Sequence, residues 1–305
     1  MRYRKASEYF RERFGQRVAR ISVDAGFSCP NRDGSLSVDG CAFCDNRAFS
    51  HNSGAGPRPL REQIEEGMRA QAARFKARIF MLYFQAYTNT YAPVGVLRER
   101  YDAARMFDSI VSVAIGTRPD CVDDSVLDLI DEYAGDYEVW IEYGLQSVRD
   151  ETLRAMNRHH TYADFLRAFE MTRRRTRIKT AAHVIIGLPG ESADDIFNTA
   201  SALGKLGVDG VKIHPMHAVK GTRLEQMWRS RAFDFYDKNA YADLCVGFIE
   251  RLSPDTVVHR FTADCPGHLL AGPGWIKEKA DIISLVERRL DDLDTFQGRL
   301  REETV

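Results

Sequence analysis

The sequence predicts an α/β fold of six consecutive βα units, followed by a C-terminal extension that contains helices and a strand. Two observations predict it. Between residues 17 and 231, short runs rich in β-branched residues alternate with longer amphipathic stretches, as parallel strands joined by helices do. The chain has 305 residues, 44% hydrophobic and 29% charged, which is enough to bury one barrel-sized core and solvate its surface.

Six apolar runs are the expected strands, and they cover residues 17–23, 78–84, 109–115, 137–143, 178–186 and 207–213. Helix-start signals lie between them. Pro59 and Pro93 suit a first helical turn, and Ser192 precedes two aspartates that favour a helix N-terminus. Right-handed crossovers allow either a partly closed barrel or an open doubly wound sheet, and periodicity alone does not separate the two.

Three segments are expected along the chain. Residues 1–16 form a basic N-terminal segment, residues 17–231 the core, and residues 232–305 an extension packed on that core. Within the extension we expect a helix over 238–252, a strand over 256–261, a helix over 275–293 and a frayed tail from Gly298.

Polar residues follow each expected strand. Both topologies bring the carboxyl ends of the strands to one rim, where functional residues are expected. After the strands come, in order, a three-cysteine loop, then Gln85, Thr88 and Asn89, then Thr117, Arg118 and Asp120, then Glu142 and Gln146, then residues 187–191, and finally His214.

The charge balance limits the classes of partner. The chain has 43 Lys and Arg against 44 Asp and Glu, a net charge of -1, so a site for a polyanion must be a local patch. The apolar stretches fall short of the roughly 20 residues that cross a bilayer. The charged first residues are unlike a secretory signal. We therefore expect a cytoplasmic protein with no membrane partner.

Three of the six cysteines lie within sixteen residues: Cys29, Cys41 and Cys44. In a reducing compartment such a group indicates metal binding, catalysis or burial more than disulfides. Three thiolates suit an iron-sulfur cube that leaves one iron free, whereas a structural zinc site needs a fourth ligand, for which His51 is the candidate. The spacing leaves both interpretations open.

Seven segments carry a family resemblance that covers nearly the whole chain. They are residues 26–34 (GFSCPNRDG), 40–44 (GCAFC), 116–121 (GTRPDC), 142–147 (EYGLQS), 187–191 (GLPGE), 212–215 (KIHP) and 297–298 (QG). Together they resemble the radical S-adenosylmethionine (SAM) enzymes, specifically the YhcC- or YtqA-like subgroup, which is related to the radical domain of the elongator catalytic subunit. Eleven residues separate Cys29 from Cys41. The family commonly has three residues at this place, and the resemblance implies a subgroup that carries a long insertion there.

The resemblance implies a partial (βα)6 barrel of the TIM type with a 4Fe-4S cluster on Cys29, Cys41 and Cys44. SAM would bind the fourth iron, and its reductive cleavage would give a 5'-deoxyadenosyl radical that abstracts a substrate hydrogen. An electron donor is implied as well, either a reductase or a protein of the flavodoxin or ferredoxin type.

The resemblance also implies which residues bind the cofactor: Phe43, Gln85, Asn89, Thr117, Arg118, Glu142, Gln146, Arg158, Gly187 and Pro189. Arg158 is expected on the SAM carboxylate because a guanidinium forks onto two oxygens. Glu142 is expected on polar atoms of SAM, with a salt bridge to an arginine as the alternative. Gly187 would let the backbone approach the adenine closely.

The expected catalytic residues are Lys212, His214 and Cys265. Lys212 and His214 would point over the radical toward the substrate. Cys265 would donate a hydrogen atom to a product radical, although burial as a small apolar side chain is the commoner fate of a cysteine.

The elongator relationship implies that the substrate is the side chain of a wobble uridine in tRNA. Local charge supports it, because residues 1–20 carry seven Arg or Lys against two Glu, and residues 173–179 form a second basic cluster. We expect Arg2, Arg4 and Lys5 to contact RNA. Two alternatives stay open: radical chemistry on a small metabolite or peptide, and a non-catalytic zinc-stabilised binding module.

Overall fold

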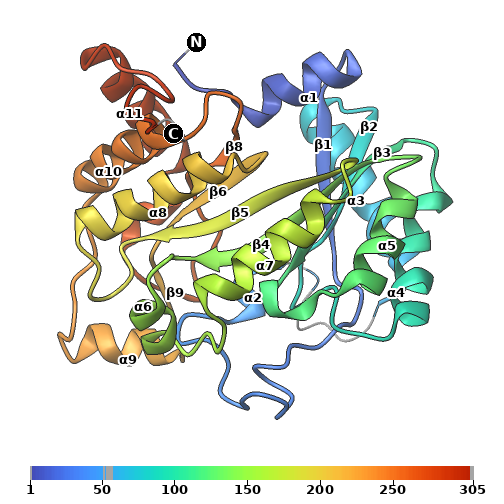
Figure 1. Cartoon of the computed structure of the whole chain (residues 1–305), viewed down its shortest axis with the longest axis horizontal. Helices are drawn as coiled ribbons and strands as arrows, with labels where there is room; N and C mark the ends of the chain where they lie inside the picture. Colours follow the sequence, from blue (N-terminus) through green and yellow to red (C-terminus); the bar gives the residue numbers. More distant parts are fainter. Residues whose placement is uncertain (1, 51, 53–57, 303–305) are drawn as a thin grey trace.

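The computed structural model describes residues 2–50, 52 and 58–302. Seven parallel strands pair into one curled sheet in the order β1-β2-β3-β4-β5-β6-β8 (Figure 1). The strands are β1 Val18–Val23, β2 Ile79–Phe84, β3 Ile110–Thr117, β4 Glu138–Gln146, β5 Ile178–Ile186, β6 Gly210–Pro215 and β8 Val257–Arg260. Their order never reverses, as in a barrel, whereas a doubly wound sheet has a point of reversal. The predicted half-barrel and its six strands are confirmed, with ends shifted by up to three residues.

Helices connect the strands and cover the outer face of the sheet (Figure 1). They are α1 Ala6–Phe14, α2 Asn46–Phe49, α3 Leu60–Phe75, α4 Val94–Tyr101, α5 Asp124–Tyr133, α6 Asp150–Ala155, α7 Tyr162–Arg173, α8 Ala193–Leu206, α9 Arg223–Arg229, α10 Lys238–Arg251 and α11 Lys279–Asp292. Ser192 caps α8 through a reciprocal bond with Asp195, as its start signal indicates. Pro59 and Pro93 also mark helix starts, but each lies at the N-cap, one residue before the expected first turn of α3 and α4.

The C-terminal extension contributes a strand to the main sheet. The sequence predicts this strand but does not predict that it joins the main sheet. Strand β8 pairs in parallel with β6, and α10 forms the crossover between them. This pairing covers the edge of β6, whose backbone groups would otherwise lack partners. A small antiparallel pair, β7 Ala218–Val219 with β9 Leu270–Gly272, lies outside this sheet.

The expected fraying from Gly298 is wrong for the first residues of the tail. The backbone N–H of Gly298 donates to Ile249 at 3.4 Å, and that of Leu300 donates to Glu250 at 2.8 Å. The Gln297 side chain, just before them, donates to the carbonyls of Ser253 and Thr256 and accepts from the N–H of Arg4. These bonds hold the tail and the N-terminal segment against the end of α10 and the loop that precedes β8.

Alternate residues of the strands point into the barrel and form layers. At the amino ends of the strands, Phe10 of α1 packs with Met81, Trp140 and Val257 in an apolar plug. Two residues further along the same strands the interior becomes polar, with Tyr83 on β2, Glu142 on β4, His183 on β5 and Lys212 on β6. The barrel is therefore closed at its amino end and polar toward its carboxyl end.

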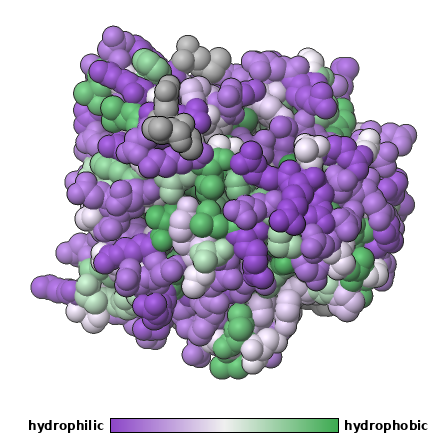
Figure 2. Space-filling model, in the orientation of Figure 1, coloured by the Kyte–Doolittle hydropathy of each residue, from purple (hydrophilic) through white to green (hydrophobic). Residues whose placement is uncertain are grey.

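The surface is mostly polar. Hydrophilic side chains cover most of the face in Figure 2, with apolar side chains only in small groups. Across the part of the chain that the structure describes, we find no helix that combines the length and the apolar character needed to span a membrane.

Candidate active site

A cavity of about 260 Å³ opens at the carboxyl ends of the strands. All three clustered cysteines line it. The other predicted residues on its walls are Phe43, Gln85, Thr117, Arg118, Glu142, Gln146, Arg158 and His214. The structure thus brings to one place residues that the sequence places on five different strand ends.

The cysteine loop is held by short-range hydrogen bonds. The backbone N–H groups of Arg32 and Asp33 donate to the carbonyl of Cys29 at 2.8 and 3.1 Å, and that of Cys44 donates to Cys41 at 3.0 Å. Gly40 has φ 73°, and a Cβ there would lie 2.9 Å from the Arg32 guanidinium. Glycine at position 40 therefore lets Arg32 fold across the loop to the carbonyl of Cys44.

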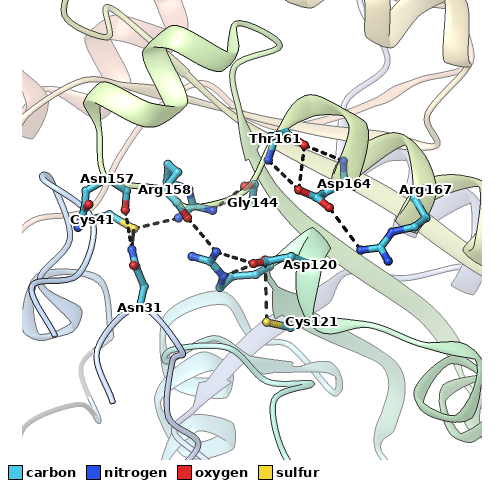
Figure 3. Close-up of polar contacts among 11 residues, drawn as sticks. Asn31, Cys41, Asp120, Cys121, Gly144, Asn157, Arg158, Thr161, Asp164 and Arg167 are labelled. Carbon is cyan, nitrogen blue, oxygen red and sulfur yellow. Dashed lines mark hydrogen bonds and ion pairs between the residues drawn. The ribbon is translucent and has the colours of Figure 1, made fainter. Parts of the chain in front are cut away.

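The sulfur of Cys41 accepts two hydrogen bonds, which are shown in Figure 3. Arg158 donates through Nη1 at 3.2 Å, and Asn31 donates through Nδ2 at 3.4 Å. Burial raises the pKa of the Cys41 thiol, but the charge of Arg158 and these bonds more than offset it, so the pKa is lowered. Burial and the charge of Cys41 raise the pKa of Cys44 to about 12. The site therefore favours the thiolate form of Cys41 and disfavours a second thiolate at Cys44 unless a bound cation is present.

Arg158 is itself fixed in place. Its Nη2 donates to the carbonyl of Gly144 at 2.7 Å, and its own carbonyl accepts from Arg118 Nη2 at 2.8 Å (Figure 3). Arg118 in turn forms a forked pair with Asp120 at 2.7 and 2.9 Å. Arg158 was predicted on the SAM carboxylate, and in this structure its partner is the sulfur of Cys41.

Glu142 is buried, and its partners come from the neighbouring strands. Lys212 Nζ donates to both carboxylate oxygens, at 2.5 Å to Oε1, and His183 Nε2 lies 2.8 Å from Oε2. Burial raises the pKa of this carboxyl, but the Lys212 charge and the His183 bond bring it well below its usual range. The salt-bridge alternative is therefore present, with a lysine in place of the expected arginine.

Of the three predicted catalytic residues, Lys212 and His214 lie two residues apart on β6, and Cys265 lies in the loop between β8 and β9. His214 lines the cavity, with its ring 5.3 Å from that of His183. Lys212 lies in the polar layer of the barrel, 4.2 Å above the ring of Tyr83. Cys265 packs beside Ala263 and is half-buried, and it is not among the described residues that line the cavity.

Three predicted cofactor contacts also lie off the cavity wall. Asn89 is buried and donates to the carbonyl of Gly116 at 2.8 Å, which ties the loop after β2 to β3. Gly187 has φ 95°, and a Cβ there would lie 3.2 Å from Tyr236. Among the described residues, neither these two nor Pro189 lines the cavity.

The structure adds residues to the cavity that sequence reasoning missed, among them Arg20, Ser22, Tyr83, His183 and Arg260. A signal for the first two was present. In β1, Arg20 and Ser22 alternate with buried Ala19, Ile21 and Val23, so the polar pair had to face the barrel interior.

The structure does not distinguish the iron-sulfur and zinc interpretations by a group of ligands that already surrounds a single metal ion. Within residues 2–50, 52 and 58–302, no three His, Cys, Asp or Glu side chains are placed to hold one metal ion. In a four-iron cluster each thiolate binds a different iron, so the ligands need not converge on one point. His51, the candidate fourth zinc ligand, lies outside the described residues.

The basic N-terminal residues are paired with carboxylates. Arg2 contacts Asp291 and Asp294 at 2.9 and 2.7 Å, and Lys5 contacts Glu287 at 2.7 Å. This segment lies beside α11, at the opposite end of the sheet from the cysteine loop (Figure 1). Arg4 is 3.7 Å from Asp255. The second basic cluster is also paired, for example Arg175 with Asp128 and Arg177 with Asp131.

Comparison with known families gives two matches that together span most of the chain. Residues 29–203 match the radical SAM superfamily, and residues 208–292 match the radical SAM C-terminal domain. The matched regions include the three cysteines, the strands β2 to β6 and β8.

Three curated relatives match between 74% and 99% of the chain. The uncharacterized protein YtqA of Bacillus subtilis is 34% identical over 99% of this chain and 95% of its own length. Protein YhcC of Escherichia coli K12 is 37% identical over 92% of this chain and 89% of its own. Elongator complex protein 3 of Schizosaccharomyces pombe is 28% identical over 74% of this chain, and the match spans 43% of that protein.

Solved structures share the fold. Elp3 of Methanocaldococcus infernus superposes with a TM-score of 0.67 at 17% identity, covering 92% of this chain and 64% of that one. Methylornithine synthase (PylB) superposes with a TM-score of 0.53 at 14% identity, covering 95% of this chain and 86% of its own.

Proposed function

Because this chain belongs to the radical SAM superfamily, we propose that it is the enzyme that modifies the side chain of a wobble uridine in tRNA. Family membership makes it an enzyme, with a 4Fe-4S cluster and SAM as its cofactors. The zinc-stabilised binding module is therefore set aside. The chemistry that these cofactors supply is the abstraction of a substrate hydrogen by a carbon radical derived from SAM.

We assign the cluster to Cys29, Cys41 and Cys44. Supporting this, all three line one cavity, and Cys41 already accepts hydrogen bonds from Arg158 and Asn31. Donors of this kind stabilise an anionic sulfur and tune a bound cluster. Arg158 and Asn31 would position the thiolate, and the buried walls of the cavity would keep water and other hydrogen donors from the reaction.

SAM would occupy the cavity beside the cysteines. Of the residues predicted from the sequence, we keep Phe43, Thr117, Gln146 and Glu142 as its contacts, because each lines that space. Gln85 is less available, since its Oε1 lies 3.2 Å from Ser22 Oγ and its amide donates to Phe49. Gly187, Pro189 and Asn89 would act through the shape of the loops that carry them.

One observation carries the choice of substrate, the similarity to elongator complex protein 3 over 74% of this chain. The cavity supports it through its charge, because five arginines line it: Arg20, Arg32, Arg118, Arg158 and Arg260. A cationic cavity suits a polyanion such as RNA. The electron donor remains a reductase or a flavodoxin- or ferredoxin-type protein, and the compartment remains the cytoplasm.

The test is tRNA-dependent turnover. Iron-loaded enzyme with SAM and a reductant should form 5'-deoxyadenosine faster with bulk tRNA than with a small-molecule extract of the same cells. Nucleoside analysis of that tRNA should show one altered uridine. Stimulation by the extract and none by tRNA would contradict the proposal and favour a small metabolite or peptide as substrate.

A further inference from the structure

The part of the cavity wall formed by β1 and β8 carries an excess of positive charge. Arg20 comes from β1 and Arg260 from the end of β8, and both line the cavity. Near them lie Lys212, which is paired with Glu142, and Lys279, which contacts Asp264. Arg260 shares Asp264, at 3.4 Å. Four cationic side chains thus face only two carboxylates.

The guanidinium of Arg20 has N–H groups that donate to no acceptor among the described residues. Its guanidinium lies 5.3 Å from the ring centre of Tyr83, and the Lys212 ammonium lies 4.2 Å from the same ring. Within the described part of the chain the contact of the Arg20 guanidinium is with this ring, and it forms no hydrogen bond or ion pair there, although a guanidinium has five N–H donors. A charged group with unused donors on a cavity wall favours an anionic ligand.

His214 presents a second unused donor. Arg260 Nη2 lies 3.4 Å from His214 Nδ1, and because a guanidinium only donates, Nδ1 must accept and Nε2 carries the proton. That Nε2 and the Nε of Arg260 are both buried without a partner among the described residues. Such groups are costly to bury unless something binds them.

The two guanidiniums also repel each other. Burial, followed by the charge of Arg20, lowers the pKa of Arg260 to about 10. An anion between them would remove both penalties, since it replaces lost hydration and screens the like charges.

We propose that Arg20, Arg260 and the Nε2–H of His214 form a subsite that binds a carboxylate or phosphate group of the substrate. This subsite rests on the proposed function and refines it, because it places an anionic group of the substrate between β1, β6 and β8, in the cavity that the cluster cysteines also line. The enzyme would orient the reacting carbon by this contact and would discriminate against neutral analogues.

The first experiment measures binding of small anions to the iron-loaded enzyme saturated with SAM. The probes are acetate, inorganic phosphate and acetamide, which is a neutral match for acetate. Ligand-observed NMR measures the binding of each probe. We expect at least one anion to bind and acetamide not to. The Arg20→Met and Arg260→Met variants should each weaken that binding about tenfold, the usual scale for a charged bidentate contact. Arg288→Met, which removes an exposed arginine of α11, should leave binding unchanged.

A second measurement uses the unaltered enzyme and so does not depend on the variants folding. Phenylglyoxal modifies arginine side chains, and mass spectrometry locates the sites. Acetate or phosphate should slow modification of Arg20 and Arg260 and leave that of Arg288 unchanged. Preference for acetate would identify a substrate carboxylate, and preference for phosphate a substrate phosphate. No anion binding and no protection would overturn the subsite.

A third arm separates this proposal from the proposed function. Anticodon stem-loops are compared in which the wobble uridine side chain ends in a carboxylate or in its neutral methyl ester. Faster 5'-deoxyadenosine formation with the acid supports both proposals. If small anions bind but neither stem-loop stimulates the reaction, the subsite stands and the tRNA assignment fails. Equal stimulation by acid and ester, with no small-anion binding, rejects the subsite alone.

Discussion

At the scale of single residues, the Cys41 sulfur accepts hydrogen bonds from both Arg158 and Asn31. The contact with Arg158 joins positions 117 residues apart in the sequence. The sequence predicts the three cysteines because their spacing is local. It does not predict the partner of Arg158, because that partner is decided by the turn between α6 and α7, which brings the guanidinium onto the sulfur.

The Arg158→Met variant should lower the midpoint potential of the bound cluster. Reduction adds negative charge, which the guanidinium and its hydrogen bond stabilise. Loss of about 1.4 kcal/mol of that stabilisation corresponds to a decrease of about 59 mV for one electron. A redox titration followed by electron paramagnetic resonance measures it.

The matched control for this change is Arg167→Met. Arg167 lies on α7 and pairs with Asp164 at 3.4 Å, away from the sulfur (Figure 3). Its removal should leave the potential unchanged. Equal potentials in both variants, at equal iron content, would mean that Arg158 does not act on the cluster.

The buried side chain of His160 makes the free energy of unfolding depend on pH. His160 is 5% exposed, and burial, followed by the charges of Arg158 and Arg118, lowers its pKa to about 2. The unfolded chain binds a proton there below pH 6.5 and the folded chain does not. This contribution to stability is therefore complete above pH 6.5 and is lost as the pH falls toward 2, at about 1.4 kcal/mol per pH unit.

His160→Phe should make the free energy of unfolding less dependent on pH. Between pH 6.5 and 5.0 the unaltered protein should lose about 2 kcal/mol more than the variant, because phenylalanine takes up no proton. Urea titrations at both pH values measure the difference. His268→Phe alters an exposed histidine and should keep the pH dependence of the unaltered protein. An unchanged slope in His160→Phe would contradict a neutral buried imidazole.

At the scale of elements, the six predicted strands are present because each has a strong local pattern. Strand β8 was predicted as a short strand of the extension, and its place in the main sheet was not. Pairing of β8 with β6 depends on α10 packing over α8, and the residues that allow it are small. Gly204 of α8 is one of them, since a Cβ there would lie 2.1 Å from the carbonyl oxygen of Arg251.

Gly204→Ala should therefore destabilise the protein. The clash is with backbone, so α8 and α10 must separate, at a cost of about 1–3 kcal/mol typical of overpacking. Urea unfolding gives the change in free energy. Gly95→Ala is the control, because Gly95 lies near the start of α4 and a Cβ added there would have no described atom within 4 Å. Equal stability of the two variants would show that α8 and α10 are not closely packed at this point.

At the scale of the whole molecule, charge is distributed differently from what the sequence indicates. The basic N-terminal segment is predicted to contact RNA, yet Arg2 and Lys5 are paired with acidic residues of α11 and the loop after it. Inside the barrel, by contrast, Arg260 shares the single carboxylate of Asp264 with Lys279, and the described residues give Arg20 no carboxylate partner. A count of charges along the chain cannot show this, because pairing across more than 280 residues is a property of the fold.

The central claim is that the cavity with Cys29, Cys41 and Cys44 holds a 4Fe-4S cluster that cleaves SAM. The most direct measurement is iron, sulfide and zinc content after anaerobic purification, together with 5'-deoxyadenosine formed on reduction with SAM. We expect about four irons and four sulfides per chain and formation of 5'-deoxyadenosine, both lost in the Cys41→Ser variant. Zinc without iron or sulfide, and no cleavage of SAM, would contradict the account.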